Sequence, residues 1–286
     1  MAERTLEEVP AAAQLPRHLR ELLTAEDETE LAILADCLED LPTVYTLEST
    51  TGEILRTELD EADLPRIREQ LWRFMAWILG RGHALNLTAI TTGPAIYERH
   101  ILDSLRILPL LDRARTEQVD DFVDIGTGAG LPGLVLAIVR ADLPTVLNDS
   151  LKKRLTFIDE VVADLGLAQV QTVHARAEDL GRQAQHREQH PVVLARAVAA
   201  LPVLAEYCLP LLRPGGVWLA PKTLAESPDT MALALQKLGG GKLETWLPEP
   251  TVAGETEHCI YSVEKLGKTP RAYPRKAGTP SKKPLT

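Results

Sequence analysis

The sequence has few aromatic residues and few cysteines, and it contains no long apolar run. Aromatic side chains make up 4% of the 286 residues, so a core must rest on Leu, Val, Ile and Ala. The three cysteines lie far apart with no Cys-x-x-Cys pair, which indicates reduced thiols in a cytosolic protein. No run approaches the ~18 apolar residues of a membrane span, and the acidic start Met1–Glu8 lacks the apolar segment of a signal peptide. These absences predict a cytoplasmic globular protein.

Charge is distributed unevenly along the chain. The net charge is −10, but residues 1–63 carry 17 acids against 4 bases, which is −13. Residues 265–286 carry 7 bases and no acid, and residues 64–264 carry a net −4. The acidity therefore belongs to the start of the chain and the basicity to its end, so an anionic partner is not excluded by the total.

The pattern of apolar residues divides the chain into four parts. Helical spacing occurs between residues 19 and 41, and residues 43–58, rich in Thr and turn formers, form a loop or a small hairpin. A helix begins at Leu64 and is expected to end at Gly80 and Gly82; a second runs from about Pro94 to Leu108. The parts are an acidic extension (1–63), a helical part (64–118), a Rossmann-like domain (119–264) and a basic tail (265–286).

From Phe122 onward, short apolar runs alternate with helical stretches of ten to fifteen residues. Strands are predicted at 122–125, 145–147, 170–173, 192–195, 216–220, 242–247 and 258–263, with helices over 134–139, 152–165, 201–212 and 229–238. This alternation predicts an α/β fold with a mostly parallel seven-stranded sheet and helices on both faces. Residues 248–256 contain no helix, so the last two strands are expected to pair as an antiparallel edge.

A glycine-rich loop follows the first of these strands. It reads Asp124-x-Gly126-x-Gly128-x-Gly130, where the chain must turn sharply and approach a ligand without a Cβ in the way. A dinucleotide fingerprint would need glycine at the position of Leu131, which argues against an NAD-dependent oxidoreductase. The spacing is instead typical of class I methyltransferases, although glycine-rich turns also occur for packing alone.

An acidic residue ends the second strand. Asp149 lies one strand–helix–strand step beyond Gly130, and a carboxylate there can accept hydrogen bonds from both ribose hydroxyls of an adenosyl group. The alternative is an N-cap for the following helix, and the two roles are compatible. The two motifs together indicate S-adenosylmethionine as the cofactor.

Several further motifs resemble one family, the bacterial 16S rRNA (guanine-N7) methyltransferases, also called glucose-inhibited division protein B. The matching segments are Asn86-Leu87-Thr88, Arg99-His100-x-x-Asp103-Ser104, Asp124–Gly133, Asp149-Ser150-x-x-Lys153-Arg154, Arg196-Ala197 and Tyr273–Pro280. The resemblance implies N7 methylation of one guanine, conventional position 527, in the 530 loop of small-subunit rRNA. The sequence departs from the family in its longer extension and in Pro221-Lys222-Thr223, where the family commonly has Lys-Gly.

The resemblance, with the motifs above, gives two sets of candidate site residues. The cofactor-binding candidates are Gly126, Gly128, Gly130, Leu131, Asp149, Ala177, Glu178 and Arg196. The nucleic-acid-binding candidates are Arg99, His100, Lys153, Arg154, Lys222, Arg271, Arg275 and Lys276. The basic tail fits a phosphate-binding arm, and its alternative is a disordered solubilising tail.

Methylation at guanine N7 needs no general base, because N7 carries a lone pair and no proton. The sequence agrees, since residues 195–200 replace the Asn/Asp-Pro-Pro-aromatic loop of amino methyltransferases and contain no Pro-Cys. Catalysis would come from alignment and exclusion of water, with Arg196 positioning the cofactor or the target base. Cys208, on the next helix, is expected in the core.

Three histidines invite functional interpretations. His100 and Asp103 are three residues apart on one helix and are expected either to hydrogen-bond near the pocket or to make a helix–helix contact. His186 and His190 have helical spacing, but their polar surroundings offer no third ligand, which predicts surface positions and no metal site.

The net-acidic body indicates recognition of a small ribosomal subunit or an assembly intermediate rather than free RNA. The competing functions are methylation of another RNA or of a protein, and an RNA-binding assembly factor with a vestigial cofactor site. An intact glycine loop with Asp149 and Arg196 argues against a vestigial site.

Overall fold

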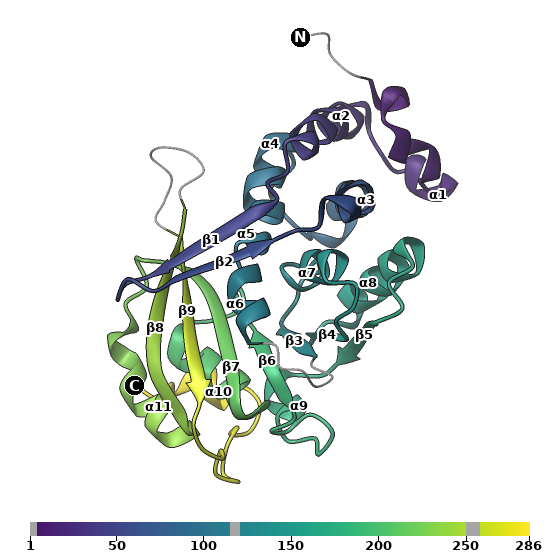
Figure 1. Ribbon diagram of the computed structural model, residues 1–286. Helices are drawn as coiled ribbons and strands as arrows, with labels where there is room; N and C mark the ends of the chain where they lie inside the picture. The colour runs from purple at the N-terminus through teal and green to yellow at the C-terminus, as the bar shows by residue number, and fades with distance from the viewer. Residues whose placement is uncertain (1–4, 115–120, 250–257) are drawn as a thin grey trace.

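The protein contains a single twisted sheet. The structure, a computed structural model, describes residues 5–114, 121–249 and 258–286 (Figure 1). Within these residues nine strands are arranged in the order β2-β1-β8-β9-β7-β6-β3-β4-β5. The strands are β1 (Val44–Ser49), β2 (Ile54–Glu58), β3 (Phe122–Ile125), β4 (Thr145–Asp149), β5 (Val170–His174), β6 (His190–Leu194), β7 (Leu212–Thr223), β8 (Gly240–Pro248) and β9 (His258–Lys265). Strands β5, β4, β3, β6 and β7 are parallel, and β9 is antiparallel to both β7 and β8. The predicted α/β fold is confirmed.

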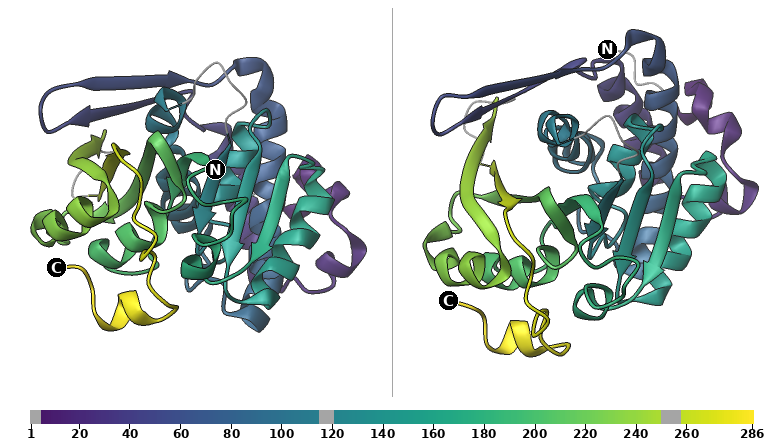
Figure 2. Two further views of the ribbon diagram at one scale, coloured as in Figure 1. Left: turned by 90° about the horizontal axis from the view of Figure 1, so that it is seen from below. Right: turned by 60° about the horizontal axis from the view of Figure 1, so that its bottom comes forward.

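Helices cover both faces of the parallel strands (Figure 2). One face carries α3 (Leu64–Leu85), α7 (Gly133–Val139) and α8 (Lys152–Leu165); the other carries α9 (Ala177–Leu180), α10 (Leu201–Cys208) and α11 (Ala232–Leu238). Successive strand residues serve opposite faces, so Phe122 packs in the first of the two cores and Val123 in the second. Cys208 is buried in the second core, as expected. Among the described residues no helix is both long and apolar enough to cross a bilayer.

The order of the strands reverses beside β3. From β3 the chain continues to β4 and β5 on one side, and it then returns to β6 and β7 on the other. Ligands of doubly wound sheets bind outside the carboxyl ends of the strands at such a reversal. The loop after β3 and the residues after β6 therefore meet where a ligand is expected.

The helical segment that precedes β3 is interrupted by a wider turn. A single helix was predicted from about Pro94 to Leu108, but the structure has four shorter pieces. These are α4 (Gly93–Ile96), the π-helical η4 (Tyr97–Leu102), α5 (Asp103–Leu105) and α6 (Leu108–Arg113). A π-helical turn holds extra residues, which changes the direction of every side chain after it.

The N-terminal extension is folded, and part of it joins the sheet. It contains η1 (Leu6–Glu8), η2 (Pro10–Gln14), α1 (Arg17–Arg20), α2 (Ala25–Glu39) and η3 (Glu61–Asp63) in addition to β1 and β2. Strand β1 pairs with β2 in a hairpin and with β8 through Leu47–Ser49. The sheet therefore has two strands more than the seven that were predicted. Strand β8 is not at the edge of the sheet, because β1 pairs with it. Most of the predicted helix-free connection between β8 and β9 lies outside the described residues.

Helix α3 is longer than predicted because its glycines do not end it. Gly80 and Gly82 lie inside the helix, which continues to Leu85. A Cβ at Gly80 would come within 2.8 Å of the Leu19 side chain, so this glycine permits close packing of the extension. Asn86, in the left-handed conformation with φ 50°, provides the actual end.

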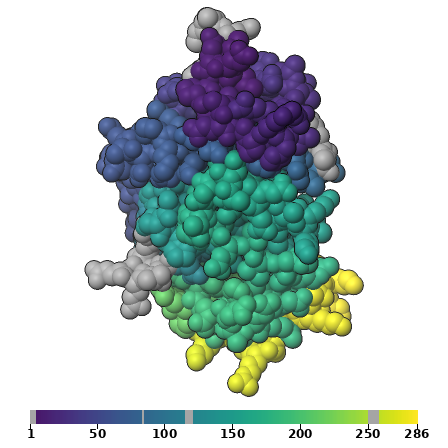
Figure 3. Space-filling view, turned by 90° about the vertical axis from the view of Figure 1, so that its right-hand side faces the viewer, coloured from purple at the N-terminus to yellow at the C-terminus, as the bar shows by residue number. Residues whose placement is uncertain are grey.

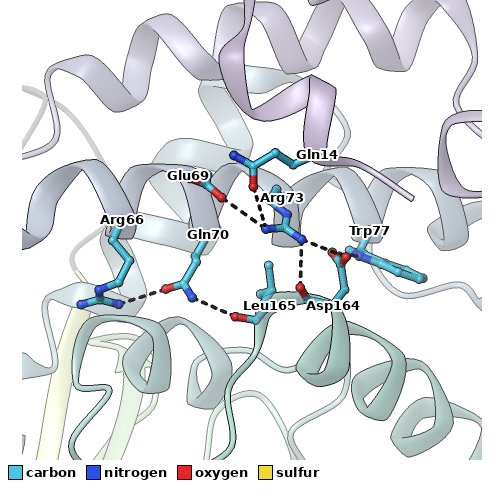
Figure 4. Close-up of polar contacts among 8 residues, drawn as sticks. All are labelled: Gln14, Arg66, Glu69, Gln70, Arg73, Trp77, Asp164 and Leu165. Atoms are coloured by element: carbon cyan, nitrogen blue, oxygen red, sulfur yellow. Dashed lines mark hydrogen bonds and ion pairs between the residues drawn. The ribbon is translucent and has the colours of Figure 1, made fainter. Parts of the chain in front are cut away.

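Arg73 on α3 connects the extension to the parallel-sheet domain (Figure 4). Its guanidinium donates to the Asp164 carboxylate at 2.9 Å and to the Gln14 side chain at 3.4 Å. The other carboxylate oxygen of Asp164 accepts a hydrogen bond from the Trp77 indole at 2.9 Å. Arg73 and Asp164 are each only 11% exposed, and Arg73 is also paired with the more exposed Glu69 at 3.2 Å, so the buried Asp164 charge is compensated chiefly by Arg73.

Replacing Asp164 with alanine should lower the free energy of unfolding by about 2–4 kcal/mol, because it leaves Arg73 with only the more exposed Glu69 carboxylate and Trp77 without an acceptor. Urea denaturation measures the change. Asp159→Ala, which removes an exposed carboxylate from the same helix, is the control and should change stability by no more than about 0.5 kcal/mol. Equal losses of unfolding free energy in the two variants would show that Asp164 does not stabilise the contact between the extension and the parallel-sheet domain.

Candidate functional site

The glycine loop after β3 is built from left-handed backbone. Gly126, Gly128 and Gly130 have φ of 68°, 61° and 93°, which side-chain-bearing residues rarely adopt. At Gly126 a Cβ would also come within 2.6 Å of Val198, which follows β6. The loop therefore requires glycine both for its turn and for the close approach of the two strand ends.

A buried carboxylate holds this loop in place. Asp124 is fully buried, and its Oδ2 accepts hydrogen bonds from the Thr127 hydroxyl at 2.7 Å and the Gly133 amide at 3.0 Å. A Cβ at Gly133 would lie 2.7 Å from that oxygen, so this position also needs glycine. Thr127 and Gly133 both lie in the motif that carries the family resemblance, but neither was predicted to have a role of its own.

The second oxygen of Asp124 has no hydrogen-bond partner among the described residues. Burial raises the pKa of Asp124 to about 6, while its hydrogen bonds to Thr127 and Gly133 and the charge of Arg196 act in the opposite direction. A buried carboxylate with an open oxygen is suited to a cationic or hydrogen-bond-donating ligand group.

Asp149 connects the glycine loop to the chain that leads into α8. Its carboxylate accepts hydrogen bonds from the Leu151 amide at 2.8 Å, at the start of α8, and from the Gly128 amide at 3.0 Å. Arg154 approaches the same carboxylate at 3.3 Å. The side chain thus fixes the start of α8 and the glycine loop together.

Asp149 lines a cavity of about 280 Å³, here named the Asp149 pocket. Its wall includes Gly126, Asp149, Arg154, Ala177, Glu178 and Tyr207. Four of the predicted cofactor residues therefore meet here, and Gly128 supports the wall through Asp149. Gly130 and Leu131 do not line it; Gly130 packs against Phe74 and Leu134, and Leu131 belongs to the core.

The C-terminal tail is a folded strap that holds the wall of the Asp149 pocket. The Gly278 amide donates to Glu178 at 2.7 Å, and the Ser281 hydroxyl lies 2.8 Å from that of Tyr207. The strap includes the short helix α12 (Thr279–Lys282). It lies at the end of the molecule opposite the extension in Figure 3.

Arg275, predicted to contact RNA, is instead an internal anchor of the strap. Its guanidinium pairs with Glu206 through three hydrogen bonds, and its backbone amide donates to the same carboxylate at 2.7 Å. Glu206 is fully buried, so the pair compensates a charge that has no access to water. The basic tail is therefore neither a disordered segment nor a free phosphate-binding arm.

A second cavity, of about 300 Å³, adjoins the first and is here named the Arg196 pocket. Ala197 lines both cavities, and its φ of 55° is unusual for a residue other than glycine. The residues that line the Arg196 pocket include Asp103, Arg106, Arg196, Pro221, Pro248 and His258. The chain after β6 therefore passes between the two cavities in a strained conformation.

Arg196 lies between two carboxylates. Burial lowers its pKa, and the charges of Asp103 and Asp124 raise it. Its guanidinium also donates to the Arg99 carbonyl at 3.4 Å. This arrangement orients a cation at the boundary between the pockets.

Of the two alternatives left open for His100 and Asp103, the mutual hydrogen bond is not formed. His100 lies 2.9 Å from the Thr88 hydroxyl, whereas Asp103 pairs with Arg106 and with His258, the latter at 3.3 Å. The π-helical turn between them places the two side chains in different directions. Burial, followed by the charge of Arg196, lowers the pKa of His100 to about 4, so its imidazole is neutral at pH 7.

The remaining predicted RNA-binding residues differ in their accessibility. Exposed side chains belong to Arg99, Lys153, Arg271 and Lys276. Lys222 is 10% exposed and is held by Glu226 at 2.6 Å and by the Ala199 carbonyl at 2.7 Å. Lys222 therefore acts in the wall of the Arg196 pocket and not as a free surface cation.

The prediction of surface positions for His186 and His190 is wrong, because both are buried. Their rings lie 3.1 Å apart at Nδ1 and Nε2, and His190 Nδ1 is 2.6 Å from the Asp121 carboxylate. The buried rings are satisfied by each other and by Asp121, which is distant in the sequence, so the polar residues around them gave no sign of their burial. The part of the chain that the structure describes holds no group of three or more metal-ligating side chains, these included.

The chain is similar to known proteins over most of its length. Residues 67–236 match the profile of a family described as rRNA small subunit methyltransferase G. A ribosomal RNA small subunit methyltransferase G from Desulfitobacterium hafniense is 42% identical over 82% of this chain and 95% of its own length. One from an Exiguobacterium species is 43% identical over 83% and 99%, respectively. Among solved structures, an S-adenosylmethionine-dependent O-methyltransferase from Thermotoga maritima has 15% identity, a TM-score of 0.45 and coverage of 80% of this chain and 96% of its own.

The strap gives a paired prediction for two neighbouring basic residues. Arg275→Ala should lower the free energy of unfolding by about 3 kcal/mol, because it leaves the buried Glu206 without a counter-charge. Lys276→Ala, at an exposed position, should change it by no more than about 0.5 kcal/mol. Thermal and urea unfolding measure both variants. Small and similar losses of unfolding free energy in Arg275→Ala and Lys276→Ala would show that the tail is not anchored through Glu206.

Proposed function

The chain belongs to the rRNA small subunit methyltransferase G family, and from this premise we propose that it methylates N7 of one guanine in 16S rRNA. The proposed donor is S-adenosylmethionine, and the proposed target is the guanine at conventional position 527. The observation that carries the proposal is the pair of adjoining pockets at the strand reversal, separated by Ala197.

The Asp149 pocket fits the proposed cofactor. Asp149 lies at the end of the second parallel strand, where a carboxylate can accept from ribose hydroxyls, and Ala177 and Glu178 would hold the adenine end. Asp124 lines neither pocket, so its charge would act on the cofactor from a distance and not by direct contact. A side chain at Gly126 would collide with Val198, which also lines the Asp149 pocket, so glycine there preserves the shape of the wall.

The two pockets also fit the proposed chemistry. S-adenosylmethionine supplies an electrophilic methyl group on a sulfonium. The N7 lone pair forms the new N–C bond as the C–S bond breaks toward sulfur, and no proton leaves N7. The residues of the chain therefore need only to bind, align and exclude water. Arg196, at the boundary of the pockets, is suited to orient the cofactor or the base.

Exposed cationic side chains that can contact RNA are present on the described surface, but they come from separate segments and not from one basic tail. Arg99, Lys153, Arg271 and Lys276 are exposed and can contact phosphates. With a net charge of −10, the whole chain is poorly suited to bind RNA through charge alone. Because the exposed cations are few and the net charge is negative, the substrate we favour is a folded ribosomal surface, in a small subunit or an assembly intermediate. Such a substrate would place the enzyme in the cytoplasm.

The proposed function is tested by incubating the protein with labelled S-adenosylmethionine and small subunits that lack the modification. The label should appear in 16S rRNA as 7-methylguanine at a single position. Label in another RNA, in protein or at another atom would replace the proposed substrate. Binding to subunits without any transfer would indicate an assembly factor with a vestigial site.

Asp124 predicts how cofactor affinity depends on pH. With its pKa raised to about 6, its carboxyl is mostly protonated at pH 5 and mostly ionised at pH 7. The ionised form should bind the positively charged cofactor more tightly, so affinity rises with pH through about 6, by up to ~10-fold between pH 5 and 7. Calorimetric titration measures this dependence.

Asp124→Asn keeps an acceptor for Thr127 and Gly133 but cannot ionise, so its cofactor affinity should be nearly independent of pH over this range. Asp159→Asn, at an exposed position, should retain the wild-type profile. If Asp124→Asn also retains that profile, the pH dependence belongs to another group.

A further inference from the structure

The Arg196 pocket contains one carboxylate among several cationic side chains. Of the described residues that line it, only Asp103 is acidic, whereas Arg106, Arg196, Lys222 and His258 carry or can carry positive charge. We propose that this pocket binds the target guanine, with Asp103 accepting hydrogen bonds from its N1–H and 2-amino groups and Arg196 donating to O6. Asp103 is thereby the residue that selects guanine. The inference rests on the proposed function, since it assigns the base that this reaction modifies.

The position of the pocket determines which edge of the base faces which wall. Ala197 separates it from the Asp149 pocket, so a base that presents N7 to the methyl donor has its N7 edge toward Ala197. O6 lies beside N7 on guanine and would meet Arg196, the neighbour of Ala197. The opposite, Watson–Crick side of the base then faces away from the cofactor, toward the remaining walls.

The charges of the pocket complement guanine and not adenine. Guanine carries acceptors at N7 and O6 and donors at N1 and N2, which match a guanidinium on one side and a carboxylate on the other. Adenine carries an amino donor in place of O6 and an acceptor at N1. It would bring its amino group toward Arg196 and its N1 lone pair toward Asp103, so both contacts would be repulsive.

The surrounding residues orient the Asp103 carboxylate. Arg106 pairs with one carboxylate oxygen, and His258 lies 3.3 Å from the other. The side chain is 14% exposed, so its contacts are shielded from much of the solvent. A carboxylate has about four acceptor positions, and these partners leave capacity for two donors from a base.

The other walls suit the faces of a base. Pro221, Pro248, Cys259 and Ile260 contribute apolar surface, and a small number of polar groups converge on it. This combination is typical of pockets that bind flat heterocyclic ligands. The 300 Å³ volume belongs to a cavity separate from the one that fits the cofactor.

Asp103 also acts on the reaction itself. Formation of the N7–methyl bond leaves a positive charge on the guanine ring, which makes N1–H a stronger donor. A carboxylate at that edge is therefore bound more strongly in the transition state than in the ground state, which lowers the barrier. Losing Asp103 should lower kcat in addition to raising KM.

The experiment combines a protein substitution with a change of one group on the base. Small subunits are reconstituted with inosine, which lacks only the 2-amino group, in place of the target guanine. Wild-type protein and Asp103→Asn are each given both substrates, and methyl transfer from labelled S-adenosylmethionine is measured. Asp159→Asn, an exposed carboxylate, is the matched control.

We expect wild-type kcat/KM to fall about 10- to 100-fold on inosine, the effect of one hydrogen bond to a charged group. Asp103→Asn should lose at least as much on guanine and should discriminate guanine from inosine several-fold less than the wild-type protein, because its amide keeps one uncharged acceptor oxygen in place of the carboxylate. Cofactor affinity, measured by calorimetry, should be unchanged in Asp103→Asn, since the Asp149 pocket is intact.

The assignment would be overturned if the loss caused by Asp103→Asn and the loss caused by inosine simply multiplied, so that the variant discriminated as strongly as the wild type. It would also be overturned if the wild-type protein methylated guanine- and inosine-containing subunits at equal rates. The second result needs no variant, so it decides the matter even if Asp103→Asn fails to fold. Failure of the proposed function is distinguishable, because wild-type protein would then leave the guanine-containing subunits unmethylated.

Discussion

The carboxylate of Asp124 is the contact on which both pockets depend. One of its oxygens binds the glycine loop through Thr127 and the start of α7 through Gly133. Its charge also acts on Arg196, which follows a different strand and lines the second pocket. A carboxylate buried this completely is stable only because those donors and that cation compensate for its lost hydration. The loop, the helix start and the arginine are thereby fixed relative to one another before any ligand binds.

The C-terminal strap provides comparable support on the other side of the Asp149 pocket. Glu178 and Tyr207 line that pocket, and each is bonded to the strap, at Gly278 and Ser281. The strap is itself anchored by the buried pair of Arg275 with Glu206. A segment whose charge suggested a phosphate-binding arm is thus a structural element that supports the wall of the Asp149 pocket. Its exposed cations can still contact phosphate, but only from a fixed surface.

The features predicted correctly from the sequence depend on residues close together in the chain. The alternation of strands and helices and the turn at Gly126 need only local patterns, and both are present in the structure. Two of the errors concern partners far apart in the chain. Arg275 pairs with a residue 69 positions away, and the hairpin β1–β2 completes its pairing with β8. Local charge or periodicity contains no information about such partners, which only the assembled fold determines.

The interrupted helix before β3 shows how a local irregularity serves a distant site. A regular helix would place His100 and Asp103 on one face, three residues apart. The π-helical turn between them separates the two side chains, so that His100 contacts Thr88 and Asp103 reaches the pocket with Arg106 and His258. His100 is kept neutral by burial and by the charge of Arg196. Asp103 instead lies among cations, with Arg106 at one carboxylate oxygen and His258 near the other. One helical segment therefore places an imidazole in the packed interior and a carboxylate in the Arg196 pocket, because the wider turn changes the direction of the side chains that follow it.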